Sequence, residues 1–143
     1  MAVANGTPTN KRLLLDQNFI TTITAPNAAN QVNGAGFDLT QATPYPTTDR
    51  IDVNIVVPAG VTGANNKNIN IWLQDSADNG NWTNTAYLAN PLFLVTDNGN
   101  TNVNVANVFV KLQPGGQRYI RMVAKGEANG SPGTGTITFQ LVF

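Results

Sequence analysis

The chain has 143 residues, of which only 11% are charged, and its eight basic and eight acidic side chains cancel to a formal net charge of zero. Such a chain lacks the basic surface that phosphate binding requires, so we expect no nucleic-acid partner. It holds no Cys and no His, which excludes disulfides and nucleophilic sites of the Ser-His-Asp or Cys-His type. Without repulsion from a net charge, association with copies of itself or with another surface is favoured.

The N-terminal residues are small and polar and contain no apolar run whose burial would order them. We therefore predict an N-terminal arm over 1–12 and a single β-sandwich domain over 13–143. The start of the chain has no positive region followed by an apolar run, and no apolar run elsewhere is long enough to cross a bilayer. We expect neither a targeting signal nor a membrane partner.

The first half of the domain predicts three extended segments. The β-branched and aromatic residues of 19–24, which are followed by Pro26, predict a strand. The Ala, Asn and Gln residues of 27–33 predict a linker. Residues 37–39 predict a short strand. Apolar and polar residues then alternate over 49–58, which is typical of a half-buried strand. Its expected inward residues are Ile51, Val53, Ile55 and Val57, and its outward residues are Arg50, Asp52 and Asn54.

The clearest strand and turn span 68–82. Ile69, Ile71 and Leu73 alternate with polar residues and with Trp72, which predicts one apolar and one polar side. The residues Asp78-Asn79-Gly80-Asn81 favour positive φ and predict a turn into a returning strand over 82–87.

Further strands are expected to the end of the chain. The apolar run 92–95 is expected to be buried, and the alternation over 103–112 changes phase at Ala106-Asn107, which predicts a bulge or a corner there. Strands at 118–124 and 136–143 complete the pattern, and the last one is expected to point Ile137, Phe139, Leu141 and Phe143 inward. About eight evenly spaced strands and no convincing helix predict an all-β, single-domain, jelly-roll-like antiparallel β-sandwich.

The acidic residues near aromatic ones match neither a catalytic nor a metal site. A glycosidase needs two opposed carboxylates, and the close pair Asp75 and Asp78 lies among turn-forming residues, so hydrogen bonds that close a turn are predicted instead. A calcium loop starting at Asp75 has Ala77 and Ala86 where oxygen ligands are required. We expect no catalytic residue, no metal and no cofactor, and hence no enzyme.

Large side chains on the polar sides of strands are the candidate partner contacts. Trp72 projects from the polar side, where it is either exposed, to bind a protein or stack on a sugar, or covered as part of the core. Arg118 and Arg121 flank Tyr119, and either face solvent or pair with an acidic neighbour. The candidate contacts are Trp72, Trp82, Tyr87, Arg118 and Arg121.

Three stretches resemble a known family. They are the Ser-x-Asp-x-Gly-x-Trp turn at 76–82 with the strand before it, the strand entry at 116–121 with its Arg-Tyr-x-Arg motif, and the ending at 135–142. They resemble the capsid cement, or decoration, proteins of tailed bacteriophages, which are small jelly-roll proteins. The turn and the strand entry also occur in other virion β-sandwiches, including tail and fibre proteins.

The resemblance implies a structural virion protein without catalytic residues. It would be made in the host cytoplasm and bind the outer capsid surface as a homo-oligomer, a dimer or a trimer, with the major capsid protein as its partner. Each oligomer would bridge neighbouring capsid proteins, and many modest contacts would add up through avidity. The alternatives are another virion β-sandwich, from a tail or fibre, and a carbohydrate-binding module.

Overall fold

The computed structural model describes residues 15–27, 29–39, 52–62, 67–85, 88–96, 105–112, 117–127 and 133–142, with the backbone alone at 15–19. The predicted arm, the inward positions Ile51 and Phe143, and the candidate contact Tyr87 lie outside the described residues. The strands are β1 (Leu15–Thr24), β2 (Gln31–Asn33), β3 (Phe37–Asp38), β4 (Asp52–Val57), β5 (Ile69–Ser76), β6 (Thr83–Asn84), β7 (Phe93–Val95), β8 (Ala106–Lys111), β9 (Tyr119–Gly126) and β10 (Thr136–Val142).

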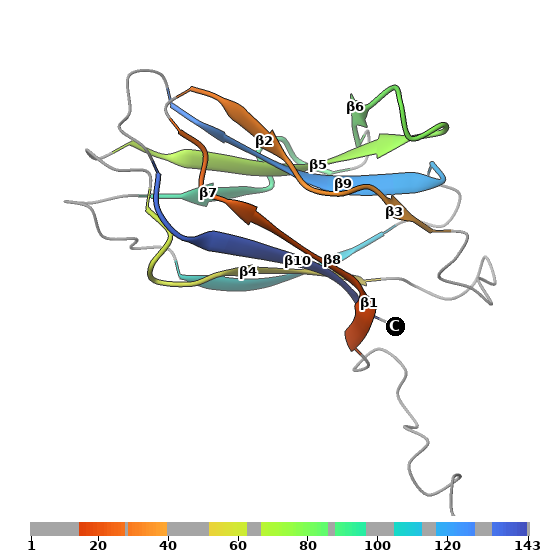
Figure 1. Ribbon diagram of the computed structural model, residues 1–143, viewed down its shortest axis with the longest axis horizontal. Helices are drawn as coiled ribbons and strands as arrows, with labels where there is room; N and C mark the ends of the chain where they lie inside the picture. The colour runs from red at the N-terminus through yellow and green to blue at the C-terminus, as the bar shows by residue number, and fades with distance from the viewer. Residues whose placement is uncertain are drawn as a thin grey trace, which may run out of the picture.

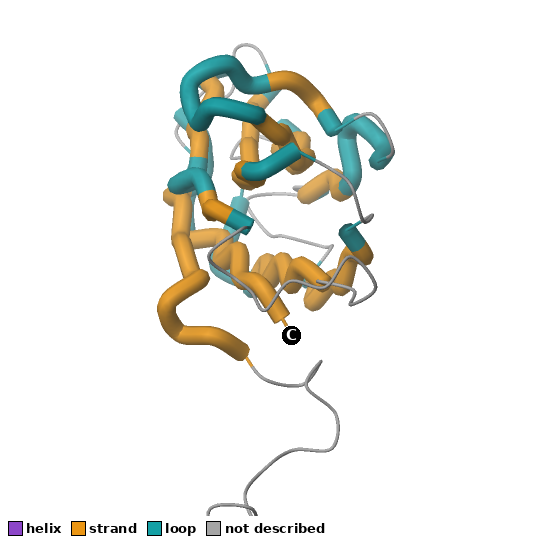
Figure 2. Tube along the Cα trace, turned by 90° about the vertical axis from the view of Figure 1, so that its right-hand side faces the viewer, coloured by secondary structure: helices purple, strands orange, loops and turns teal. Residues whose placement is uncertain are grey.

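The strands form two antiparallel sheets that pack face to face (Figure 1). One sheet has four strands in the order β1-β10-β4-β8, and the other has six, in which β9 and β5 are central. In the six-stranded sheet, β2 and β3 both pair with β9, while β6 and β7 both pair with β5. Figure 2 shows the same two layers from the end of the sandwich.

The order of the strands is that of a jelly roll. When β2 with β3 and β6 with β7 are each counted as one interrupted strand, the ten strands become eight, four in each sheet. The chain then passes to the opposite sheet at every connection except the one from β5 to β6. Two four-stranded sheets connected in this way are the double-sheet jelly roll, and the predicted all-β sandwich is confirmed.

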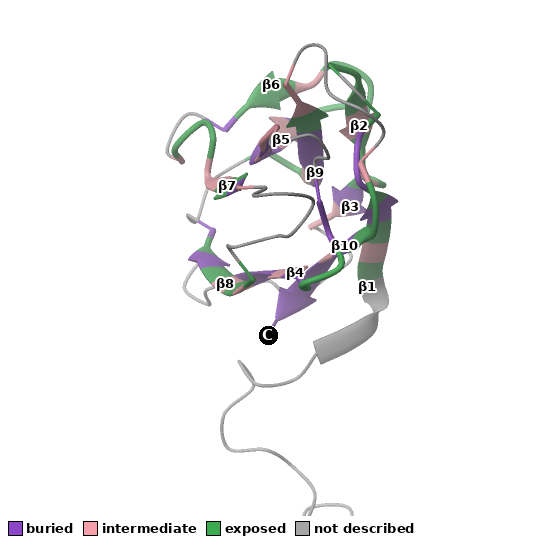
Figure 3. Cartoon of the chain, turned by 90° about the vertical axis from the view of Figure 1, so that its left-hand side faces the viewer, coloured by how far each residue is buried: buried purple, intermediate pink, exposed green. Residues whose placement is uncertain are grey.

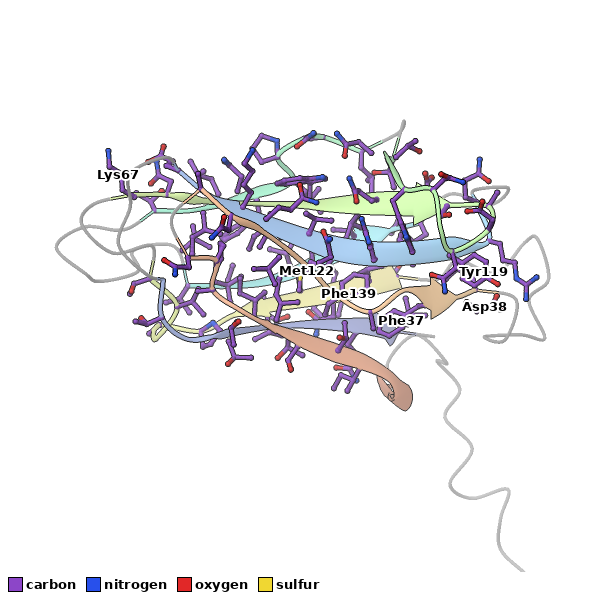
Figure 4. The ribbon with its side chains drawn as sticks, turned by 45° about the horizontal axis from the view of Figure 1, so that its top comes forward. Phe37, Asp38, Lys67, Tyr119, Met122 and Phe139 are labelled. Atoms are coloured by element: carbon purple, nitrogen blue, oxygen red, sulfur yellow. The ribbon has the colours of Figure 1, made fainter. Side chains whose placement is uncertain are left out.

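The core lies between the sheets, where the predicted inward residues meet. Figure 3 shows buried residues on the strands of both sheets, and the inward residues of β4, β5 and β10 are almost wholly buried: Val53, Ile55, Val57, Ile69, Ile71, Leu73, Ile137, Phe139 and Leu141. The ring of Phe37 in β3 stacks on that of Phe139 in β10, with centroids 5.2 Å apart. This pair, with Met122 nearby, joins the two sheets (Figure 4).

Three local predictions are wrong. The expected linker 27–33 contains β2, whose backbone pairs with the neighbouring β9 although Gln31 and Asn33 are exposed, because sheet hydrogen bonds need no apolar side chain. The run 92–95 is not wholly buried, since Leu94 is exposed on the strand β7. Of the bulge or corner expected at Ala106-Asn107, the bulge does not occur, because β8 pairs with β4 in unbroken register over 106–111; residues 101–104, on the other side of the phase change, lie outside the described residues.

Candidate functional site

Trp72 lies on the outer side of the six-stranded sheet, as its alternation predicts. It stands opposite Val123 of β9, yet only 8% of its surface is exposed. Its indole N–H donates a hydrogen bond to Asn84 Oδ1 over 2.9 Å. Of the two alternatives that the sequence left open, the covered tryptophan is the one observed.

Asn84 begins a chain of hydrogen bonds across three neighbouring strands. Its Oδ1 also accepts a bond from Gln74 Nε2 at 3.1 Å, and Gln74 Oε1 accepts bonds from Arg121 Nε at 3.1 Å and Nη2 at 2.7 Å. Gln74 is paired in register with Asn84 on one side and with Arg121 on the other. The register of β6, β5 and β9 therefore places these side chains in a row.

The ring of Trp82 packs against Arg121, at one end of this chain of hydrogen bonds. The Arg121 guanidinium lies 4.3 Å from the centroid of the Trp82 ring, a cation–π contact, and burial lowers the pKa of Arg121. The ring also reaches the connection between β2 and β3, because a Cβ placed on Gly36 would come within 2.8 Å of Trp82 Cη2. We call Trp72, Gln74, Trp82, Asn84 and Arg121 the tryptophan network.

The tryptophan network unites three of the five candidate contacts, but its polar groups bind one another. The hydrogen bonds of Trp72 and Arg121 are made within the network, and one face of the Trp82 ring is occupied by Arg121. A sugar-binding platform needs exposed aromatic faces, which Trp72 does not offer. The network therefore joins strands of the six-stranded sheet and fixes the loop that carries Trp82.

Arg118 lies apart from this network. Its Nε and Nη2 donate to the two carboxylate oxygens of Asp38 at 3.0 and 2.7 Å, so the acidic neighbour that the sequence suggested belongs to the same chain. This ion pair raises the pKa of Arg118. The guanidinium also lies 5.0 Å from the Tyr119 ring centroid, and Asp38 and Tyr119 mark one end of the sandwich in Figure 4.

The turn before Trp82 is built on Asp78, as predicted. Its carboxylate accepts hydrogen bonds from the backbone N–H groups of Asn81 and Gly80 and from side chains of Asn81 and Ser76, while Asn79 has a positive φ of 61°. These bonds, the one from the Asn81 backbone first, hold the pKa of Asp78 well below its ordinary value of 3.8. Asp78 therefore stabilises the turn.

We expect Asp78→Ala to destabilise the protein at neutral pH and much less in acid. The folded state lowers the pKa of Asp78, so its contribution is present above the unfolded pKa and disappears as the pH falls through the folded value. Urea unfolding of both proteins from about pH 7 to about pH 2 measures this difference. A difference in unfolding free energy that does not shrink with acid would contradict the prediction.

The outer face of the four-stranded sheet carries exposed apolar side chains. One row of paired residues crosses it from Ile20 through Gln140 and Asn54 to Phe109. The two ends are exposed, Ile20 by 45% and Phe109 by 57%, whereas Gln140 and Asn54 are buried. Val105 precedes β8 and is 61% exposed.

Two acceptors on the same face have no donor. Asn54 Oδ1 and Asp52 Oδ1 are buried and make no hydrogen bond, although the sequence predicted both side chains to face solvent. Buried acceptors without a hydrogen bond are uncommon in folded proteins, where an ordered water often supplies the donor. This face, from Ile20 to the β8 residues Phe109 and Lys111 and the adjoining Val105, is the candidate partner-binding surface.

Sequence reasoning did not select this surface, although one signal was present. Phe109 stands on the polar side of its alternating segment, as Trp72 does on its own strand. Only the pairing of strands shows that Trp72 has a covering neighbour while Phe109 lies on a strand at the edge of its sheet.

Comparisons with known proteins found no match to a protein-family model or to a curated protein sequence. Within the described part of the chain, no cluster of three or more Asp, Glu, His or Cys side chains is placed to hold a metal ion. The same residues contain no helix of the length and apolarity that spanning a membrane would require.

Proposed function

We propose that the protein is a structural virion protein that binds the outer surface of a bacteriophage capsid. It acts as a homo-oligomer that cements neighbouring major capsid proteins and performs no catalysis. The proposal starts from the sequence resemblance at 76–82, 118–121 and 135–142, and the fold agrees with it. A jelly roll also serves lectins and enzymes, so the fold alone does not decide the function.

The observation that carries the proposal is a set of exposed apolar side chains at the edges of the four-stranded sheet. Three large apolar side chains are exposed to solvent: Ile20, Val105 and Phe109. Exposed apolar side chains are common at protein–protein interfaces. Exposed apolar side chains of this kind suit a protein partner better than a small polar ligand.

Co-sedimentation tests this function. Purified protein is mixed with mature phage shells that lack it, and with isolated tails as a control, and each mixture is pelleted. We expect saturable binding to shells at a fixed number of copies, and a higher temperature for heat-induced DNA release from decorated particles. Failure to bind the shells would overturn the proposal, and binding to tails alone would favour the tail or fibre alternative.

A further inference from the structure

Among the described strands, β8 lies at the edge of its sheet and pairs only with β4. No described strand pairs with the backbone donors and acceptors on its other side. Proteins usually protect such edges with bulges, prolines or interruptions. β8 has an unbroken register and no proline, whereas β1, at the opposite edge of the same sheet, has a register shift between Leu15 and Ile20.

The edges of the other sheet are shorter. β2 and β3 cover three and two residues, and β6 and β7 cover two and three. β8 provides six residues in a row. Of the described edges, β8 therefore offers the longest regular template for another strand.

The side chains along β8 are complementary to themselves. Val105, which directly precedes β8, and Phe109 are both exposed and lie four residues apart, so an extended chain through 105 places them on one side. When a second β8 runs antiparallel about a two-fold axis at Asn107, residues whose numbers sum to 214 stand opposite one another. Each Phe109 then faces the other copy's Val105, a favourable aromatic and β-branched cross-strand pair, and the two Asn107 side chains meet at the axis.

Other registers leave the apolar side chains without such partners. An axis at Val108 sets Phe109 against Asn107 and Val105 against the charged Lys111. An axis at Phe109 pairs the two phenylalanines but sets Lys111 against Asn107 and leaves Val105 beyond the paired strand. The Asn107 register alone among these three joins both exposed apolar residues.

Charge also permits this register. The chain has no net charge, and the single charged side chain of β8 is Lys111. In the Asn107 register the two Lys111 residues stand eight positions apart along the strands, about 27 Å at 3.4 Å per residue. This distance exceeds the screening length of about 8 Å at physiological ionic strength, so the lysines do not oppose association.

We propose that β8 pairs with β8 of a second copy about a two-fold axis at Asn107, which joins two four-stranded sheets into one. The pairing identifies the self-association surface of the homo-oligomer, and so it rests on the oligomeric part of the proposed function. In this register residues 105–109 of the two copies stand opposite one another, and so short a contact buries less than the roughly 800 Å² per partner of a standard interface. The dimer is therefore weak in solution, and it becomes stable when a repeating lattice holds the copies close together and so raises their effective concentration.

Disulfide trapping tests the register, because the natural chain has no Cys and an introduced thiol has no competitor. Residues at the axis of an antiparallel pair have Cα atoms about 4.5–5.5 Å apart, within the range of a disulfide. Asn107→Cys is expected to form a covalent dimer under mild oxidation at least about tenfold faster than Lys111→Cys, which lies on the same strand and side but far from its copy. Equal rates, or no dimer from Asn107→Cys, would overturn the proposal.

A second set of variants tests the apolar pair. Adding Val105→Ser and Phe109→Ser to the Asn107→Cys protein is expected to slow cross-linking to the rate of the Lys111→Cys control. Both residues are exposed, so folding is expected to persist, and the thermal melt checks this. Unchanged cross-linking in the folded variant would overturn the assigned contacts. These experiments use no shells, so their failure is distinguishable from a failure of capsid binding.

Discussion

Replacing Phe139, the largest of the fully buried side chains among the described residues, by Ala is expected to lower the free energy of unfolding by about 3–5 kcal/mol. Phe139 is fully buried in β10 and stacks nearly parallel on Phe37, with 7° between the rings. Because the two rings come from opposite sheets, their contact crosses the interior of the sandwich. The truncation removes apolar burial and leaves a cavity that a close-packed interior only partly refills.

Urea unfolding followed by tryptophan fluorescence measures this loss. Thr138→Ala is the matched control, since Thr138 is the neighbouring residue and points to the outer side of the same strand. The control is expected to stay within about 1 kcal/mol of the natural protein. A Phe139→Ala loss as small as that of the control would show that the two sheets do not depend on this contact.

Replacing Gly135 by Ala is expected to cost about 2–4 kcal/mol. Gly135 has a φ of 89°, a conformation that side chains with a Cβ rarely adopt. An added Cβ would also lie 2.5 Å from the carbonyl oxygen of Gly60 and 2.8 Å from Val61 Cα. Both neighbours are backbone, so they do not move aside without disturbing the strands.

The surrounding hydrogen bonds explain why this position affects the whole fold. Ala25 N–H donates to Gly135 C=O at 2.9 Å, and the backbones of Thr62 and Thr134 exchange two bonds of 3.0 Å. At Gly135 the end of β1, the segment after β4 and the start of β10 therefore meet. Strain there is transmitted to three strands of the four-stranded sheet.

Gly60→Ala is the matched control for this prediction. A Cβ at Gly60 would have no atom within 4 Å, so a small or slightly stabilising effect of about 0.5 kcal/mol is expected. Thermal unfolding of the two variants measures the contrast. Similar melting temperatures for Gly135→Ala and Gly60→Ala would contradict the assigned strain.

The predicted sandwich and the candidate contacts differ in how well they agree with the structure. Alternation at Val53, Ile55 and Val57 correctly indicated an inward side, because successive residues of any extended chain point to opposite sides. The same rule correctly placed Trp72 on the outer side of its strand. It did not reveal that Asn84 and Arg121 belong to a network with Trp72, since those contacts depend on which strands become neighbours.

Local sequence was therefore enough for the fold class, the inward residues of β4, β5 and β10, and the Asp78 turn, each of which depends on residues close together in the chain. Tertiary structure alone decided that Gln31 to Asn33 join a sheet, that Trp72 is covered, and that Phe109 and Val105 remain exposed. The physical reason is that burial on the outer side of a sheet depends on pairing partners tens of residues away. The position of β8 at a sheet edge, from which the proposed dimer follows, is a property of the strand order.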